Sequence, residues 1–151
     1  MFYMIIPSLL LIICGLMSGD ILEWRKYFVL GIISSLVIAG ILILFTDSSE
    51  RVKSILSAFM IAVIFCFGTV GTLNYYYDPS EPVITESEIY DKYKIARKST
   101  SYYLEVRLSN GNIKGLTVSY DDYNDAKIGE RVKIYEYAGL FDIPYAEIHL
   151  D

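Results

Sequence analysis

Hydrophobic and polar residues are distributed unevenly along this chain of 151 residues. Three long stretches without a charged residue lie in the first half, at 1–19, 27–46 and 54–77. A helix needs about 20 apolar residues to cross the hydrocarbon core of a bilayer, and a single segment satisfies its own backbone there only as a helix. The pattern therefore predicts a transmembrane region at 1–77 with three helices, at about 2–19, 27–46 and 54–77.

Aromatic side chains gather where the predicted helices would leave the membrane. Tyr75, Tyr76 and Tyr77 end the third stretch, and Trp24 and Tyr27 stand at the start of the second. Tyrosine and tryptophan are enriched at membrane–water interfaces, because their rings prefer the acyl chains and their polar atoms reach the headgroups. We therefore predict a membrane-interface role for these five residues, in preference to an aromatic ligand site.

The predicted helices also carry small residues four positions apart. Gly31, Ser35 and Ala39 would share one face of the second helix, and Ala58 and Ala62 one face of the third. Small faces let helices approach closely, so we predict that these residues pack the helices together within the chain, in preference to forming a dimer face. The three stretches contain no ionisable Asp, Glu, Lys, Arg or His, which argues against proton relay or ion-coupled transport.

Basic residues near the stretches give a weak signal for orientation. Arg25 and Lys26 precede the second stretch, and Arg51 and Lys53 precede the third. Basic residues favour cytoplasmic loops, and none follows the third stretch until Lys92. The pattern favours a cytoplasmic N-terminus and an extracytoplasmic C-terminal domain.

A different pattern follows a linker at 78–85. In the stretch SYYLEVRLS at 101–109, apolar and polar residues alternate, which is typical of a half-buried strand. An Asn-Gly-Asn turn at 110–112 leads into a second strand at 113–119, so this region predicts a hairpin. The same alternation predicts further strands at 84–95, 131–137 and 145–150.

These strands predict a small all-β domain at 86–151. Ser119 is placed to be the N-cap of one short helical turn, with Asp122 three residues further on. Five short strands with one helical turn are typical of an OB-like or SH3-like barrel. A closed barrel would also remove exposed strand edges.

The net charge of −5 belongs to this C-terminal domain, because acidic and basic residues balance before residue 78. An acidic domain repels phosphate backbones, which argues against nucleic acid as a partner.

Residues for catalysis or metal binding are scarce. His149 is the only histidine, and both cysteines, Cys14 and Cys66, lie in apolar stretches. A catalytic Ser-His-Asp or Cys-His arrangement is therefore disfavoured. The usual sets of zinc ligands are excluded. The acidic cluster at 121–125 lacks the glycine and terminal glutamate of a calcium loop. We expect no enzyme activity, no metal and no cofactor.

Tyrosines interleaved with basic residues form the candidate binding surface. Aromatic rings beside basic side chains can stack on bases or grip a glycan. The alternative is that half of these rings fill a small core and the others are strand formers. The candidates are Tyr90, Tyr93, Tyr103, Arg107 and Tyr135.

One run of residues in the second half of the chain resembles a known kind of domain. It is similar to the C-terminal β-domain of uncharacterised small bacterial multi-span envelope proteins. The order of the whole chain, membrane spans followed by a β-domain, also resembles that of NfeD-type membrane proteins. The resemblance implies a multi-pass protein of the bacterial inner (plasma) membrane with a scaffold or partner-binding role. The residues that carry it are Tyr102-Tyr103-Leu104, Val118-Ser119, Tyr123, Gly129-Glu130-x-Val132 and Gly139-Leu140-Phe141-x-Ile143-Pro144-Tyr145.

The functional expectation is a non-enzymatic, membrane-anchored interaction or accessory protein. Its surroundings would be the lipid bilayer, and its β-barrel would bind a partner protein, an envelope component or a second copy of the chain. The alternative is a small-ligand or nucleotide sensor with a cytoplasmic barrel, which would signal through the spans.

Overall fold

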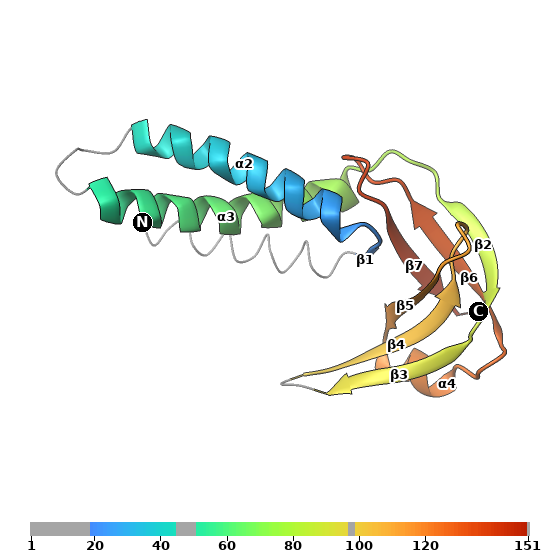
Figure 1. The fold of residues 1–151 in the computed structure, drawn as a ribbon. Helices are drawn as coiled ribbons and strands as arrows, with labels where there is room; N and C mark the ends of the chain where they lie inside the picture. The colour runs from blue at the N-terminus through green and yellow to red at the C-terminus, as the bar shows by residue number, and fades with distance from the viewer. Residues whose placement is uncertain (1–18, 45–50, 97–98, 151) are drawn as a thin grey trace. The chain divides into compact units, whose positions relative to one another are not determined.

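The structure is a computed structural model that describes residues 19–44, 51–96 and 99–150. The chain divides into two compact units. The helical unit contains residues 23–78, and the β-unit contains residues 19–22 together with 79 onwards (Figure 1). The predicted span at 2–19 falls almost wholly outside the described residues.

Within the described residues, the helical unit contains α2 (Trp24–Leu44) and α3 (Arg51–Tyr76), which pack against each other. At about 1.5 Å per residue, the 21 residues of α2 extend for about 31 Å, close to the thickness of a hydrocarbon core. Both helices are long and apolar enough to span a membrane. Much of their apolar surface is exposed, including Ile33, Leu36 and Val37 of α2. In water such a surface would be a large unfavourable patch, whereas lipid would cover it.

Small residues form the contact between the two helices. Gly31, Ser35 and Ala39 are buried on α2, and Ala62 is buried on α3. A side chain at Gly31 would approach the ring of Phe67 to 2.8 Å, so glycine is needed for this spacing. The side chain of Ala58 lies outside the described residues.

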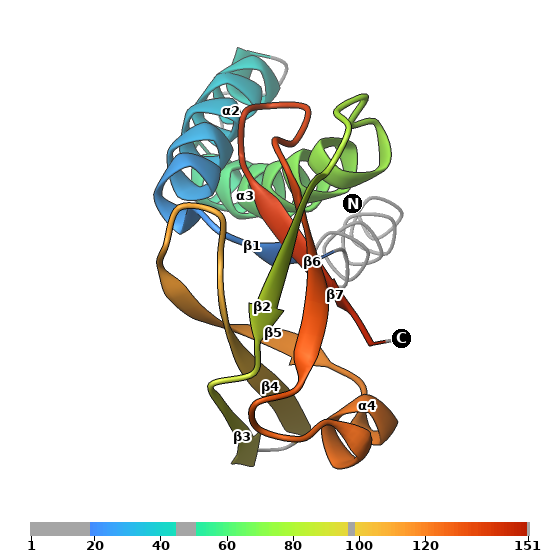
Figure 2. The same cartoon turned by 90° about the vertical axis from the view of Figure 1, so that its right-hand side faces the viewer.

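The β-unit contains seven strands in two antiparallel sheets (Figures 1 and 2). The first sheet has the order β1-β7-β6-β2, and the second has the order β3-β4-β5. The strands are β1 (Asp20–Ile21), β2 (Val83–Glu88), β3 (Asp91–Ala96), β4 (Thr100–Arg107), β5 (Ile113–Val118), β6 (Arg131–Tyr137) and β7 (Tyr145–His149). The core between the sheets contains Leu104, Val106 and Leu116 from one sheet and Ile134 and Ala146 from the other.

Several local predictions are confirmed. The predicted hairpin is formed by β4 and β5, and the predicted strands at 131–137 and 145–150 are β6 and β7. The short helix α4 (Tyr120–Asp125) begins after the N-cap Ser119, whose hydroxyl accepts a hydrogen bond from the Asp122 backbone at 3.1 Å. These elements depend on residues close together in the sequence.

The long strand predicted at 84–95 is wrong, because the chain bends there and changes sheet. β2 pairs with β6, whereas β3 pairs with β4. At the bend, the Ile89 backbone is bonded to Gly129 and Glu130, but the Tyr90 N–H already donates to Glu105 O at 2.8 Å. Ile89 is 1% exposed, so burial of its side chain fixes the position of the bend.

The closed five-stranded barrel is also wrong. Among the described residues, no backbone ladder joins the two sheets. Side chains bridge them instead. At one seam, the Thr117 N–H and hydroxyl donate to the Asp20 carboxylate, the hydroxyl at 2.9 Å. At the other seam, Ser87 Oγ accepts from the Arg107 backbone at 2.9 Å.

Candidate binding surface of the β-unit

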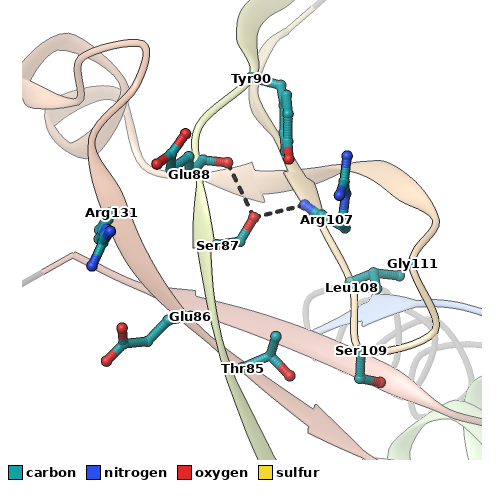
Figure 3. A pocket seen from close by; sticks show the side chains of 10 residues that line it. All are labelled: Thr85, Glu86, Ser87, Glu88, Tyr90, Arg107, Leu108, Ser109, Gly111 and Arg131. Carbon is teal, nitrogen blue, oxygen red and sulfur yellow. Dashed lines mark hydrogen bonds between the residues drawn. The ribbon is translucent and has the colours of Figure 1, made fainter.

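A pocket of about 500 Å³ opens on the β-unit (Figure 3). Its lining includes β2, which passes between β4, carrying Arg107, and β6, carrying Arg131 (Figure 3). Small-molecule sites in proteins commonly have volumes of about 300–1,000 Å³. The pocket is therefore large enough for a small ligand or for a side chain of a partner protein.

Ser87 holds the middle of the pocket in place. It is one of the few buried polar residues, and its hydroxyl makes two backbone hydrogen bonds. It accepts from the Arg107 N–H at 2.9 Å and donates to Glu88 O at 3.1 Å. A buried hydroxyl without a partner is costly, and both bonds satisfy it. The bond from the Arg107 N–H also fixes β2 against β4, where no ladder joins the two strands.

Tyr90 and Arg107, both predicted as binding residues, are brought together at the pocket. The Arg107 guanidinium lies over the Tyr90 ring, with Cζ 5.2 Å from the ring centroid. The ring is anchored by the backbone bond from Tyr90 to Glu105. A cation–π contact of this kind is worth about 0.5–1 kcal/mol at an exposed site.

Arg131 places a second cation on the pocket. It stands opposite Glu88 in the register of β2 and β6. Neither Arg107 nor Arg131 makes an ion pair with any residue that the structure describes. Two exposed guanidiniums can each grip a carboxylate or phosphate with two parallel hydrogen bonds. Arg131 was not among the predicted binding residues, because only the strand register shows that it reaches this place.

The turn at the far end of the pocket is held by Glu136. Its two carboxylate oxygens accept from the Ser109 N–H at 2.6 Å and from the Ser109 hydroxyl at 2.9 Å. Gly111 has φ +83° in this turn, a conformation that suits glycine. The pocket wall formed by Leu108, Ser109 and Gly111 is therefore well fixed.

Tyr93 and Tyr103 lie elsewhere on the second sheet, stacked with ring centroids 5.1 Å apart. Tyr103 and Arg107 are four residues apart on β4 and share its outer face, at a separation of about 13 Å. Gly115 lies beneath Tyr93, and a side chain there would collide with the Tyr93 hydroxyl. Burial raises the pKa of Tyr93, and the negative charges of Glu105 and Asp20 act in the same direction.

Tyr135 does not join this surface. It lies on β6 beside His149, with ring centroids 4.7 Å apart, and it does not line the pocket. His149 is exposed, with Nε2 3.8 Å from a Glu147 carboxylate oxygen. Of the five predicted binding residues, Tyr90 and Arg107 therefore meet at the pocket, Tyr93 and Tyr103 stack on the second sheet, and Tyr135 lies apart from both pairs.

Lys114 makes hydrogen bonds that no sequence pattern predicted. Its Nζ donates to Ile21 O at 2.7 Å and to Leu22 O at 3.3 Å. Burial lowers the pKa of Lys114, and the nearby Asp20 opposes this shift. The lysine thus satisfies backbone carbonyls at and next to the short edge strand β1.

The predicted membrane-interface residues differ in exposure. Trp24, Tyr76 and Tyr77 are exposed, and Tyr75 is half-buried with its ring 5.0 Å from that of Tyr76. Tyr27 is buried instead. Its hydroxyl donates to Phe67 O at 2.8 Å, so it also links α2 to α3.

Among the described residues, no three His, Cys, Asp or Glu side chains gather closely enough to hold a metal ion. Comparison of the chain with protein-family models, with curated proteins and with solved structures finds no match in any of the three. The resemblance to multi-span envelope proteins and to NfeD-type proteins stays a prediction.

Proposed function

We propose that this chain is a multi-pass membrane protein whose β-unit is a binding module held at the membrane surface. The predicted helix at 2–19 would join α2 and α3 as a third span. The exposed apolar surfaces of α2 and α3 support this proposal, because lipid is the solvent that suits them. The bacterial inner membrane, with the β-unit extracytoplasmic, is the proposed location.

The pairing of β1 supports one feature of the topology. β1 immediately precedes α2, and β2 follows α3 after a short linker, yet both belong to the same sheet. The chain between them must therefore cross the membrane an even number of times, as α2 and α3 would. A span at 2–19 would then place the N-terminus on the opposite side from the β-unit.

The proposed activity is non-enzymatic binding of a partner protein or envelope component at the pocket around Tyr90. The observation that carries it is the pair of guanidiniums, Arg107 and Arg131, which lack carboxylate partners among the described residues. Arginine and tyrosine are enriched where binding energy concentrates in interfaces. A partner segment carrying a carboxylate or phosphate would supply the missing anion.

Site-specific photo-crosslinking in cells tests this activity. A photoreactive phenylalanine analogue in place of Tyr90 should give a discrete adduct, and Arg107→Ala should reduce its yield. Tyr120 on α4 is a matched control, since it is also exposed but does not line the pocket. Equal adducts at Tyr90 and Tyr120, or none at Tyr90, would count against the proposed interface.

A second candidate is a sensor for a small anionic ligand such as a nucleotide. The size of the pocket, about 500 Å³, favours it, since a mononucleotide needs a cavity of this order. This reading requires a cytoplasmic β-unit. Calorimetric titration of the full chain in detergent with a nucleoside monophosphate tests it. Saturable binding lost in Arg107→Ala supports the sensor, and absence of heat in the wild type rejects that ligand class.

A further inference from the structure

The loop between β6 and β7, at residues 138–144, presents apolar side chains at its tip. Leu140 is 40% exposed and Phe141 is 39% exposed. The neighbouring Ile143 is 1% exposed and packs inward. The loop is thus anchored by one apolar side chain while two others remain accessible to solvent.

The conformation of the loop is well defined. Gly139 has φ +79° and Asp142 has φ +56°, and the Asp142 N–H donates to Gly139 O at 3.0 Å. The base of the loop is closed by Tyr137 and Tyr145, whose rings stack with centroids 4.8 Å apart. Two residues in the left-handed region and a stacked base together form a tight turn that projects its tip.

Both sides of this loop are tied to the residues that flank the helices. On one side, the Ala138 N–H donates to Ser80 Oγ at 3.2 Å. On the other, the Leu22 N–H donates to Pro144 O at 2.7 Å, next to the pairing of β1 with β7. Ser80 and Leu22 belong to the β-unit itself, so these bonds are internal to it.

Chain length then limits how far the loop lies from the membrane surface. Ser80 is three residues after Tyr77, and Leu22 is two residues before Trp24, both predicted interface residues. Since an extended chain covers at most about 3.6 Å per residue, the two ties lie within about 11 Å and 7 Å of the interface. No other tip of the described β-unit combines two such ties with exposed apolar residues.

We infer that Leu140 and Phe141 insert into the boundary between headgroups and acyl chains and dock the β-unit on the bilayer. This inference rests on the proposed membrane anchoring by α2 and α3. Burial of the two side chains in the interface supplies apolar contact that the acidic β-unit cannot obtain from anionic headgroups. The partner of this surface is therefore the lipid bilayer itself, and a bilayer without net charge is sufficient for docking.

Tryptophan quenching by lipids with brominated acyl chains tests the inference. The full chain is reconstituted in zwitterionic vesicles, with Trp24→Phe combined with Phe141→Trp or, independently, Leu140→Trp. The control is Ile128→Trp in the same background. Ile128 is 61% exposed but precedes β6, whose seven residues separate it from the loop by about 23 Å.

The wild-type chain, in which Trp24 is the only tryptophan, reports on the anchoring itself. We expect Trp24 and both loop tryptophans to be quenched to a similar degree, and Ile128→Trp to be unquenched. If Trp24 is quenched but neither loop variant exceeds Ile128→Trp, the docking inference is wrong while anchoring stands. If Trp24 is unquenched, the anchoring and the inference both fail. Loop tryptophans shielded from aqueous iodide but unquenched by lipid would place protein there, which also overturns the inference.

Discussion

Removing the Asp20 carboxylate should loosen the edge of the β-unit at β1. Asp20 accepts two hydrogen bonds from Thr117 and so joins β1 to the free edge of β5. Asp20→Ala abolishes both. The bonds are exposed, and water replaces them in part, so each contributes about 0.5–1.5 kcal/mol, or about 1–3 kcal/mol for the pair.

Amide hydrogen exchange in the full chain measures this loss directly. The Leu22 N–H is bonded to Pro144 O and exchanges only when β1 opens. A loss of about 1–3 kcal/mol corresponds to exchange faster by about 5- to 150-fold, since 1.4 kcal/mol is a factor of ten. Asp20→Asn keeps one carbonyl acceptor and should give a smaller acceleration. The Leu108 N–H, bonded to Asn112 O, should be unchanged in both variants.

Asp91→Ala is the charge-matched control, because Asp91 is an exposed acid on β3 whose carboxylate accepts a hydrogen bond from the adjacent Lys92 backbone at 2.8 Å and does not join the two sheets. It should leave the Leu22 exchange rate at the wild-type value. Unchanged Leu22 exchange in Asp20→Ala would refute the claim that the Asp20 carboxylate holds β1 to β5. Equal acceleration in Asp91→Ala would refute it too.

Three further predictions follow from packing and titration. Gly115→Ala should destabilise the chain by about 1–3 kcal/mol through collision with Tyr93, and Tyr93→Phe should recover part of this loss in a double-mutant cycle measured by chemical denaturation. Gly31→Leu should drive α2 away from Phe67, seen as lower thermal stability in detergent, whereas Gly40→Leu should be neutral because open space surrounds that position. Because the pKa of Lys114 is lowered in the folded chain, the unfolded chain binds more protons between that lowered pKa and the ordinary value of 10.5. Stability should therefore rise with pH through this window, and Lys114→Met should flatten that rise in unfolding measurements.

The parts of the fold that the sequence predicted are those encoded by near neighbours. The hairpin of β4 and β5 depends on alternation and on the turn at 110–112, and α4 depends on its N-cap Ser119. β1 has only two residues, and its partners Tyr145 and Ala146 lie more than a hundred positions away, so no local pattern marks it. The bend at Ile89 is similarly invisible, because an apolar residue fits an unbroken strand equally well.

The candidate site was predictable by residue type but not by arrangement. Tyr90 and Arg107 were selected as an aromatic and a cation on strands, yet only the meeting of two sheets brings them into one pocket. Arg131 was missed, since its place depends on the register of β6 against β2. Tyr135 lies apart from the pocket, because β6 places it beside His149.

In the proposed topology, α2 and α3 cross the membrane and leave the β-unit on one side of it. Single cysteines at Glu23, Asn124 and Ser48, in a chain lacking Cys14 and Cys66, test this with a membrane-impermeant thiol reagent on cells with a permeable outer layer. Glu23 flanks the start of α2, Asn124 is exposed on α4, and Ser48 lies between α2 and α3 in the sequence. We predict labelling at Glu23 and Asn124 and protection at Ser48 until lysis. The reverse pattern would place the β-unit in the cytoplasm and favour the sensor, and identical accessibility of Asn124 and Ser48 would contradict the membrane hairpin itself.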